Sequence, residues 1–350
     1  MKYVSVLGDS ISTFSGYNPE GYSVYFTKEM QIANKLDSVD DTWWAKVIHA
    51  FGLQLCANAS YSGSRVSGVQ FPAATSGRRI QDLRKGRCSP DLILVFMGIN
   101  DFGYGVPVTF PKRLLHKTDL MCFRDAYHEL LRKLGKAYPN AQIVCGTLMR
   151  GRLSDDEDWR FPESNGVCRL EDYNDVIRHA AGKKQYLLAD TANTGIRYET
   201  LDGGHPTKTG HMEIAAAWIR CLVKTGVIKP SLEMCIRINR ITKSADMKHL
   251  LFRCLMEEPV RIPVDTDGSG TISCITFEEQ KLLPVFFSEE ETQSYYPDQT
   301  RCVKMRDYIQ EILARNAGIV LNPFSEPEKQ YLLGVPGKKI PVDHFHDPVY

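Results

Sequence analysis

Short apolar runs alternate with longer amphipathic stretches through the first part of this chain. Five runs have the length and composition of buried strands, and they lie at 3–7, 53–57, 92–97, 142–147 and 186–189. Between them apolar residues recur at helical spacing, at 43–48, 122–137, 169–181 and 207–223. This alternation predicts an α/β fold in which a parallel sheet carries helices on both faces.

Two common architectures of this class lack their defining motifs. A Rossmann dinucleotide site requires Gly-x-Gly-x-x-Gly after the first strand, and residues 8–12 do not supply it. An α/β-hydrolase nucleophile elbow requires Gly-x-Ser-x-Gly, which occurs nowhere in the chain. The sequence therefore favours a doubly wound sheet of another type.

Four polar blocks carry the candidate chemistry, at 8–10, 58–63, 98–101 and 202–206. Three of them follow the ends of strand-like runs, where open α/β sheets place ligand-binding residues. Each block alone is common turn or cap composition. A serine hydroxyl needs a base, an acid that orients the base, and donors for the oxyanion that its attack creates. Because the four blocks together offer all of these groups, they predict acyl transfer.

The blocks resemble the GDSL, or SGNH, hydrolase superfamily over about the first 225 residues, an ordinary domain size. The resemblance implies that Ser10 is the nucleophile, His205 the base and Asp202 the carboxylate that orients it. It also implies an oxyanion hole made by Ser10, Gly63 and Asn100. The implied fold is a flavodoxin-like three-layer α/β/α sandwich with the active site at the carboxyl ends of the strands. Neither a metal nor an organic cofactor is expected.

Two details of the match depend on register. Gly63 is preferred to Gly68 because the stretch 58–64 resembles the family's Asn-x-x-x-Ser-Gly pattern. Ile11 and Ser12 follow the serine where the name-giving motif has leucine, a departure that leaves the nucleophile unchanged.

The loops after the third and fourth strands, 102–111 and 149–164, are long enough to build a substrate pocket. Four of their side chains could stack on or hydrogen-bond a sugar or a polar acyl carrier: Tyr104, Arg150, Arg152 and Trp159. The alternative is that these side chains only fold the loops.

Charge and hydropathy limit the classes of partner that the chain is expected to bind. The chain has 43 basic and 42 acidic residues and a net charge of +1, which gives no electrostatic attraction to nucleic acid or anionic membranes. No apolar run approaches the roughly 20 residues that cross a bilayer. The first strand begins at once, which leaves no room for a secretory signal. Ten cysteines without a Cys-x-x-Cys pair indicate reduced thiols. We therefore expect a cytoplasmic enzyme with a small-molecule ester substrate.

The alternation stops near Pro230, which predicts a hydrolase domain at 1–229 and a second domain at 236–350. The second part is expected to contain helices at 245–256 and 304–315 and strands at 260–264, 272–277, 282–287 and 318–321. Its runs 283–291 and 318–324 resemble the SseB N-terminal-like domain, a small α+β module. That resemblance implies a fold and little chemistry, so a protein partner of this domain is possible but unknown.

Three further features have structural interpretations. Residues 265–272 match the start of an EF-hand loop, but Thr276 stands where the bidentate Glu is required, so a Gly-rich hairpin turn is favoured. His344 and His346 lack ligand partners at metal-site spacing and indicate a polar tail. His211 follows His205 on the next helix and is expected to be a packing or surface histidine.

The sequence as a whole predicts a serine ester hydrolase that cleaves short-chain acyl or O-acetyl esters, with a carbohydrate as one carrier, through an acyl-enzyme. A lysophospholipase or thioesterase is the alternative within the same class of enzyme. A binding protein whose carboxyl-terminal domain docks a partner is the alternative outside it. A basal esterase assay separates the enzymes from the binding protein, since a pure binding protein has no physical need for the complete serine, histidine and aspartate set.

Overall fold

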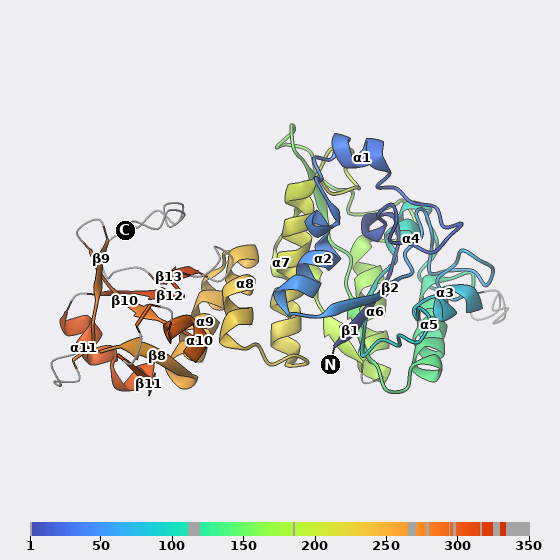
Figure 1. Ribbon diagram of the computed structural model, residues 1–350. Coiled ribbons are helices and arrows are strands. Elements are labelled where there is room, and N and C mark those ends of the chain that lie inside the picture. The colour runs from blue at the N-terminus through green and yellow to red at the C-terminus, as the bar shows by residue number, and fades with distance from the viewer. Residues whose placement is uncertain are drawn as a thin grey trace. The chain divides into compact units, whose positions relative to one another are not determined.

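The chain divides into two compact units, Met1–Lys229 and Pro230–Tyr350, which are described here one at a time (Figure 1). The computed structural model describes residues 2–110, 120–184, 186–264, 271–277, 280–293, 295–296, 299–315, 317–324 and 330–333. The second unit begins before the predicted residue 236 because a helix, α8, starts at Leu232.

Unit 1 is built on a five-stranded sheet with the order β2-β1-β3-β4-β6. All four pairings in this sheet are parallel. The strands are β1 (Tyr3–Gly8), β2 (Gln54–Asn58), β3 (Leu92–Phe96), β4 (Gln142–Gly146) and β6 (Leu187–Ala189). This is the doubly wound order of flavodoxin-like sheets. The five predicted strands and their parallel arrangement are thereby confirmed.

Helices cover both faces of the sheet, as predicted. They are α2 (Trp43–Ala50) and α7 (Lys208–Thr225) on one face, and α5 (Phe123–Ala137) and α6 (Leu170–Lys184) on the other (Figure 1). Side chains along β3 alternate between the two layers. Phe96 meets the rings of Trp43 and Trp218 at 5.5 and 5.7 Å, whereas Ile93 and Val95 belong to the core of α5 and α6.

The remaining elements of unit 1 are short and gather around the strand ends. They are η1 (Ser10–Ser12), α1 (Lys28–Ala33), η2 (Val39–Asp41), α3 (Gly77–Gln81), α4 (Ile99–Gly103), β5 (Gly151–Leu153), η4 (Thr191–Thr194) and β7 (Tyr198–Thr200). Strands β5 and β7 form a separate parallel pair. Strand β5 follows β4 in the chain, and β7 precedes the loop that contains 202–206.

The prediction of uniformly reduced cysteines is wrong for one pair. Cys56 in β2 and Cys88 form a disulfide, with their Cα atoms 5.8 Å apart. A tight reversal, in which Lys85 and Cys88 pair as an antiparallel bridge, brings Cys88 next to β2. Cys145 and Cys221 are buried free thiols, as expected.

Unit 2 is an α+β structure with its own apolar core. Its helices are α8 (Leu232–Thr242), α9 (Ala245–Glu257), α10 (Glu289–Gln293) and α11 (Ile309–Ala314), with a 3₁₀ turn η5 (Met305–Asp307). Its strands are β8 (Pro259–Pro263), β9 (Ile275–Phe277), β10 (Gln280–Val285), β11 (Thr300–Lys304), β12 (Gly318–Leu321) and β13 (Tyr331–Leu333). They form a four-stranded sheet, β13-β12-β10-β9, and a pair, β11-β8.

Several predictions for this unit need correction or stay open. The sequence analysis missed α8, and the helix predicted at 304–315 starts only at Ile309, because Thr300–Lys304 pairs with β8 as a strand. The EF-hand-like residues 265–270 lie outside the described residues, so the hairpin turn expected there stays a prediction. His344 and His346 also lie outside the described residues. The resemblance to SseB stays a prediction.

Among the described residues, none of the helices combines the length and the apolar character that crossing a bilayer requires.

Candidate active site

Ser10 lies in a sharp turn directly after β1. Asp9 caps this turn by accepting a hydrogen bond from the backbone N–H of Ile11 at 3.1 Å, so Ser10 is the first residue of η1. The turn folds back so closely that a Cβ atom on Gly8 would clash with the side chain of Ser12. A glycine is therefore required before Asp9.

His205 and Asp202 reach Ser10 from a loop near the other end of unit 1. His205 Nε2 is 3.0 Å from Ser10 Oγ, and His205 Nδ1 is 2.7 Å from Asp202 Oδ2. The other carboxylate oxygen of Asp202 accepts the backbone N–H groups of Gly204 at 2.9 Å and His205 at 2.7 Å. The short Asp-x-x-His spacing thus folds the carboxylate beneath the imidazole.

These hydrogen bonds fix the charge on Asp202 and the tautomer of His205. Burial acts to raise the pKa of Asp202, but the hydrogen bonds from the His205 side chain and from the His205 and Gly204 backbone outweigh it and hold this pKa well below its usual range. An ionised carboxylate only accepts hydrogen bonds, so Nδ1 of His205 carries the proton. Nε2 is then free to accept the hydroxyl proton of Ser10.

Tyr25, which the sequence analysis missed, lies directly on this histidine. Its ring stacks on the His205 imidazole with centroids 3.5 Å apart and planes 7° from parallel. Its hydroxyl donates to Asp202 Oδ2 at 3.2 Å. Tyr25 belongs to the loop between η1 and α1 and to no motif, so only the folded loop reveals it.

Gly63 comes from the loop after β2, and Asn100 comes from α4, which follows β3. Strands β2 and β3 are the two neighbours of β1 in the sheet. Asn100 Nδ2 donates to the carbonyl of Ser64, next to Gly63, at 3.0 Å, which uses one of the two N–H groups of this amide. Gly63 has a φ of +76°, a left-handed conformation that favours glycine. Among the described residues no hydrogen bond joins Ser10 to either residue, so their roles as oxyanion donors stay predictions.

Two buried charged groups hold the three loops together, and neither was singled out from the sequence. Arg79 is fully buried and donates to the carbonyls of Gly8 at 2.8 Å, Ala59 at 2.9 Å and Pro72 at 2.7 Å. Asp101, beside Asn100, accepts the backbone N–H groups of residues 66 and 67 at 2.7 and 2.9 Å. The loops after β1, β2 and β3 are therefore joined by side-chain to backbone hydrogen bonds.

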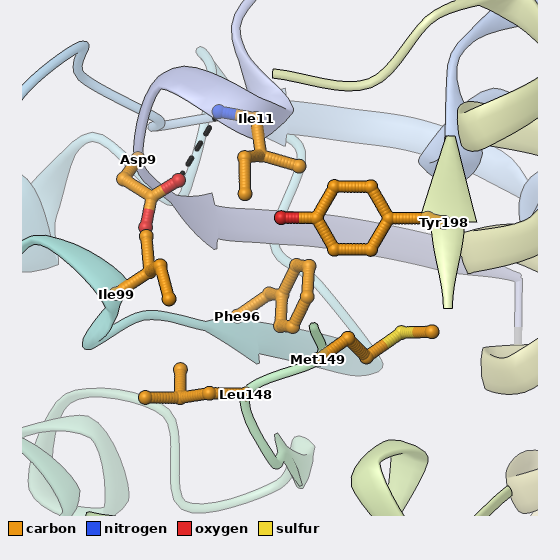
Figure 2. A pocket seen from close by; sticks show the side chains of 7 residues that line it. All are labelled: Asp9, Ile11, Phe96, Ile99, Leu148, Met149 and Tyr198. Atoms are coloured by element: carbon orange, nitrogen blue, oxygen red, sulfur yellow. Dashed lines mark hydrogen bonds between the residues drawn. The ribbon is translucent and has the colours of Figure 1, made fainter. Parts of the chain in front are cut away.

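Asp9 and Ile11, which flank Ser10 in the chain, line a small pocket (Figure 2). The pocket is otherwise lined mainly by apolar side chains, and its lining residues are Asp9, Ile11, Phe96, Ile99, Leu148, Met149 and Tyr198. Figure 2 shows that Tyr198 points its hydroxyl across the pocket toward the turn formed by residues 9 and 11. Its empty volume is about 210 Å³, including the open mouth.

Burial of Asp9 has a consequence for stability. Only 2% of this residue is exposed, and burial raises the pKa of its carboxyl from 3.8 to about 7 against the opposing hydrogen bond from Ile11. A folded-state pKa above the unfolded value gives stability that is complete below about pH 4 and is lost as the pH rises through about 7. A pKa difference of this size corresponds to at most about 4 kcal/mol.

The free energy of unfolding of the wild type should therefore fall between pH 5 and pH 8. We expect that of Asp9→Asn to fall much less over the same range. Asparagine keeps an oxygen for the Ile11 N–H but does not ionise. The measurement is urea unfolding of both proteins at the two pH values, followed by tryptophan fluorescence, since residues 43, 44, 159 and 218, the chain's 4 tryptophans, all lie in unit 1. If the free energies of unfolding of the two proteins differ by the same amount at both pH values, the buried carboxyl of Asp9 is not the cause of the pH dependence.

The candidate loop residues have different surroundings. Arg152 forms ion pairs with Glu199 at 3.3 Å and Glu213 at 2.7 Å, so it folds the loop, as the alternative interpretation holds. Trp159 lies against Gly203, where a Cβ atom would be 2.8 Å from the indole.

Tyr104 and Arg150 remain open to ligand. Tyr104 is 69% exposed, with the guanidinium of Arg65 over its ring at 5.6 Å. Arg150 lines a second pocket, described below. His211 is buried and accepts the backbone N–H of Trp43 at 3.2 Å, which confirms a packing role.

Comparisons with known proteins identify one family. Residues 2–158 match the family model described as GDSL-like lipase/acylhydrolase. No curated protein matches the chain.

Several solved structures resemble part of the chain. A GDSL-like lipase from Bacteroides ovatus is 27% identical over 64% of this chain and 99% of its own, with a TM-score of 0.47. A GDSL-like lipase from Bacteroides uniformis is 30% identical over 65% and 95%, with a TM-score of 0.46. An active-site mutant of a family two carbohydrate esterase from Clostridium thermocellum is 16% identical over 65% of both chains, with a TM-score of 0.41.

Proposed function

Residues 2–158 belong to the GDSL-like lipase/acylhydrolase family, which makes the chain an ester hydrolase, and we propose that it releases short acyl groups through an acyl-enzyme on Ser10. The observation that carries the proposal is the continuous hydrogen-bonded series from Ser10 Oγ through His205 to Asp202, at 3.0 and 2.7 Å. A serine held in this way is an activated nucleophile.

The reaction follows from the geometry of these three residues. Ser10 Oγ attacks the ester carbonyl as its proton passes to His205 Nε2, and Asp202 stabilises the imidazolium that forms. When the tetrahedral intermediate collapses, His205 gives the proton to the leaving alcohol and the acyl group stays on Ser10. Water then repeats the sequence on the acyl-enzyme and releases the acid.

The oxyanion donors in this proposal are the backbone N–H groups of Ser10 and Gly63 and the side-chain amide of Asn100. Neither backbone N–H donates to an acceptor among the described residues, so both are available to a substrate oxygen. Asn100 retains one N–H beyond the one it gives to Ser64. Such preorganised donors are the largest single contribution in many acyl-transfer enzymes.

The small pocket lined by Asp9 and Ile11, the chain neighbours of Ser10, favours a short acyl group. Its space is narrow, since the volume of about 210 Å³ is reached only when the open mouth is included. Apolar side chains such as Phe96, Ile99 and Leu148 line it, which suits an acetyl or other small acyl group. A long fatty acyl chain, as in a lysophospholipid, would need a larger apolar cavity.

A second pocket shares Leu148 with the first and is polar. Its volume is about 770 Å³ including the open mouth, and its polar lining residues are Arg150, Glu171, Asn174, Asn193 and Arg197. Paired donors and acceptors of this kind suit a hydroxyl-rich molecule better than a lipid. The two pockets together favour a short acyl group on a polar carrier such as a carbohydrate over the lysophospholipase or thioesterase alternative.

The test is hydrolysis of an aryl ester series from acetate to dodecanoate, run beside an acetylated sugar such as xylose tetraacetate. We expect kcat/KM to be highest for acetate to butyrate and to fall about tenfold or more for chains of eight carbons, because methylenes that the pocket cannot hold must displace its lining, at a cost of about 1–3 kcal/mol. Release of acetate from the sugar, measured enzymatically, completes the assay.

A rising kcat/KM toward dodecanoate would contradict the short-acyl proposal and favour the lipid alternative. If the protein hydrolyses none of the esters, the acyl-enzyme proposal is contradicted and a binding protein is favoured. We also propose a cytoplasmic location, which the buried free thiols of Cys145 and Cys221 support, and a docking role for unit 2.

A further inference from the structure

We infer that Tyr25 is a positioning residue for this reaction, holding the His205 imidazole in the plane and tautomer that Ser10 requires. The inference rests on the proposed function, since it assigns a role to a neighbour of its base. The inference adds a residue to the serine, histidine and aspartate pattern, because Tyr25 lies outside the four sequence blocks that suggested the pattern.

Two independent contacts carry the inference. The Tyr25 ring covers one face of the imidazole at a centroid distance of 3.5 Å and an angle of 7°. The Tyr25 hydroxyl donates to Asp202 Oδ2 at 3.2 Å, the same oxygen that accepts His205 Nδ1 at 2.7 Å. One side chain therefore contacts both members of the pair that orients the base.

The charge state of Tyr25 suits this role. Burial, with the adjacent Asp202 carboxylate, raises the pKa of the Tyr25 phenol to about 12, so the hydroxyl stays a donor across the working pH range. The face of an aromatic ring attracts a cation, and the imidazole becomes a cation when it takes the Ser10 proton. The stacked ring therefore favours the charged form that arises during the reaction.

The loop that carries Tyr25 is tied to the nucleophile turn. The backbone N–H of Tyr25 donates to Thr13 Oγ1 at 2.9 Å, and Thr13 Oγ1 donates to the Ser10 carbonyl at 2.9 Å. Asn18 in the same loop donates to the carbonyls of Asn58 and Ser60 at 3.3 and 3.0 Å. The ring is thus placed relative to Ser10 by a fixed segment.

A rival role for Tyr25 is contact with substrate alone, as one wall of the site. The two roles differ in the kinetic constant they change. A residue that orients the base acts in the transition state and lowers kcat, whereas a wall that binds substrate equally in both states raises KM.

The experiment compares Tyr25→Phe, which keeps the stacked ring, with Tyr25→Met, which keeps a bulky apolar side chain but neither contact. We expect kcat for aryl acetate to fall about 2- to 10-fold in Tyr25→Phe, as one modest hydrogen bond implies. We expect about a 10²-fold fall in Tyr25→Met, the size associated with a misplaced catalytic group. KM should change by no more than about twofold in either variant.

Two further measurements separate positioning from a general structural defect. The low-field proton resonance of the His205 Nδ1–H should shift in Tyr25→Phe and disappear through exchange in Tyr25→Met. Tyr17→Leu is the matched control, since Tyr17 lies in the same loop, packs on Phe14 and Trp44, and is 44% exposed. It should keep wild-type kcat.

Wild-type kcat in Tyr25→Met, or a loss expressed only in KM, would overturn the inference. If Tyr25→Met fails to fold by tryptophan fluorescence, Tyr25→Phe decides, and an unchanged kcat with an unchanged resonance overturns it. Failure of the proposed function looks different, because an active Ser10→Ala variant would remove the acyl-enzyme whatever the Tyr25 variants do.

Discussion

Ser10→Ala should lose esterase turnover by a factor of about 10⁴ or more while unit 1 keeps its fold, because no other group can supply the nucleophile of the acyl-enzyme. Within the described part of the chain, the Ser10 hydroxyl forms its only hydrogen bond with His205 Nε2, at 3.0 Å, and the Asp9 cap of the turn does not involve it. The loss should therefore appear in kcat for an aryl acetate, with the unfolding midpoint of tryptophan fluorescence nearly unchanged.

Ser76→Ala is the matched control for this variant. The Ser76 hydroxyl is buried and has no hydrogen-bond partner among the described residues, so its removal should leave turnover at the wild-type level. A folded Ser10→Ala protein that still turns over substrate would remove Ser10 from the mechanism.

Asn100→Ala should lower kcat by about 10²- to 10³-fold with only a modest change in KM, because an oxyanion donor engages mainly the transition state. The amide has one N–H to spare after its bond to the Ser64 carbonyl at 3.0 Å. Steady-state kinetics on aryl acetate and the unfolding midpoint should be measured on one preparation.

The rival interpretation makes Asn100 only a tether between the loops after β2 and β3. Loss of a tether predicts a lower unfolding midpoint with near-normal kcat per folded molecule. Asn165→Ala is the matched control, since Asn165 Nδ2 also donates to a backbone carbonyl, that of Phe102 in α4, at 2.7 Å. If both variants lose the same activity, the tether explains Asn100 and the oxyanion assignment is wrong.

The strands of unit 1 could be predicted because their signal is local. A strand buried on both faces must be apolar throughout, as β3 is at Leu92–Phe96. The Thr42 cap of α2 is local in the same way, since its side chain accepts from the N–H of Ala45 at 3.3 Å. Segments near Pro230 and at 304–315 were harder, because α8 follows directly on a boundary signal and β11 depends on its partner β8.

The site was predictable only where the chemistry has a fixed spacing in sequence. Asp202 and His205 sit three residues apart and are recognisable as a pair, and Ser10 follows a strand directly. Tyr25 has no such signature, because its contact with His205 depends on the path of an entire loop.

Contacts between residues that are far apart in the sequence could not be predicted either. The disulfide between Cys56 and Cys88 joins residues with a sequence separation of 32, and only the sheet order and a tight reversal bring them together. Arg79 reaches the Gly8 carbonyl across a separation of 71 residues. Composition and periodicity carry no information about contacts of this range.

The separation between nucleophile and base has a consequence during protein synthesis. Ser10 and His205 are 195 residues apart, so a nascent chain carries the proposed nucleophile long before the proposed base exists. At about 5–20 residues per second, a ribosome needs roughly 10–40 seconds to cover that interval. The proposed acyl transfer therefore becomes possible only after residue 205 has been translated.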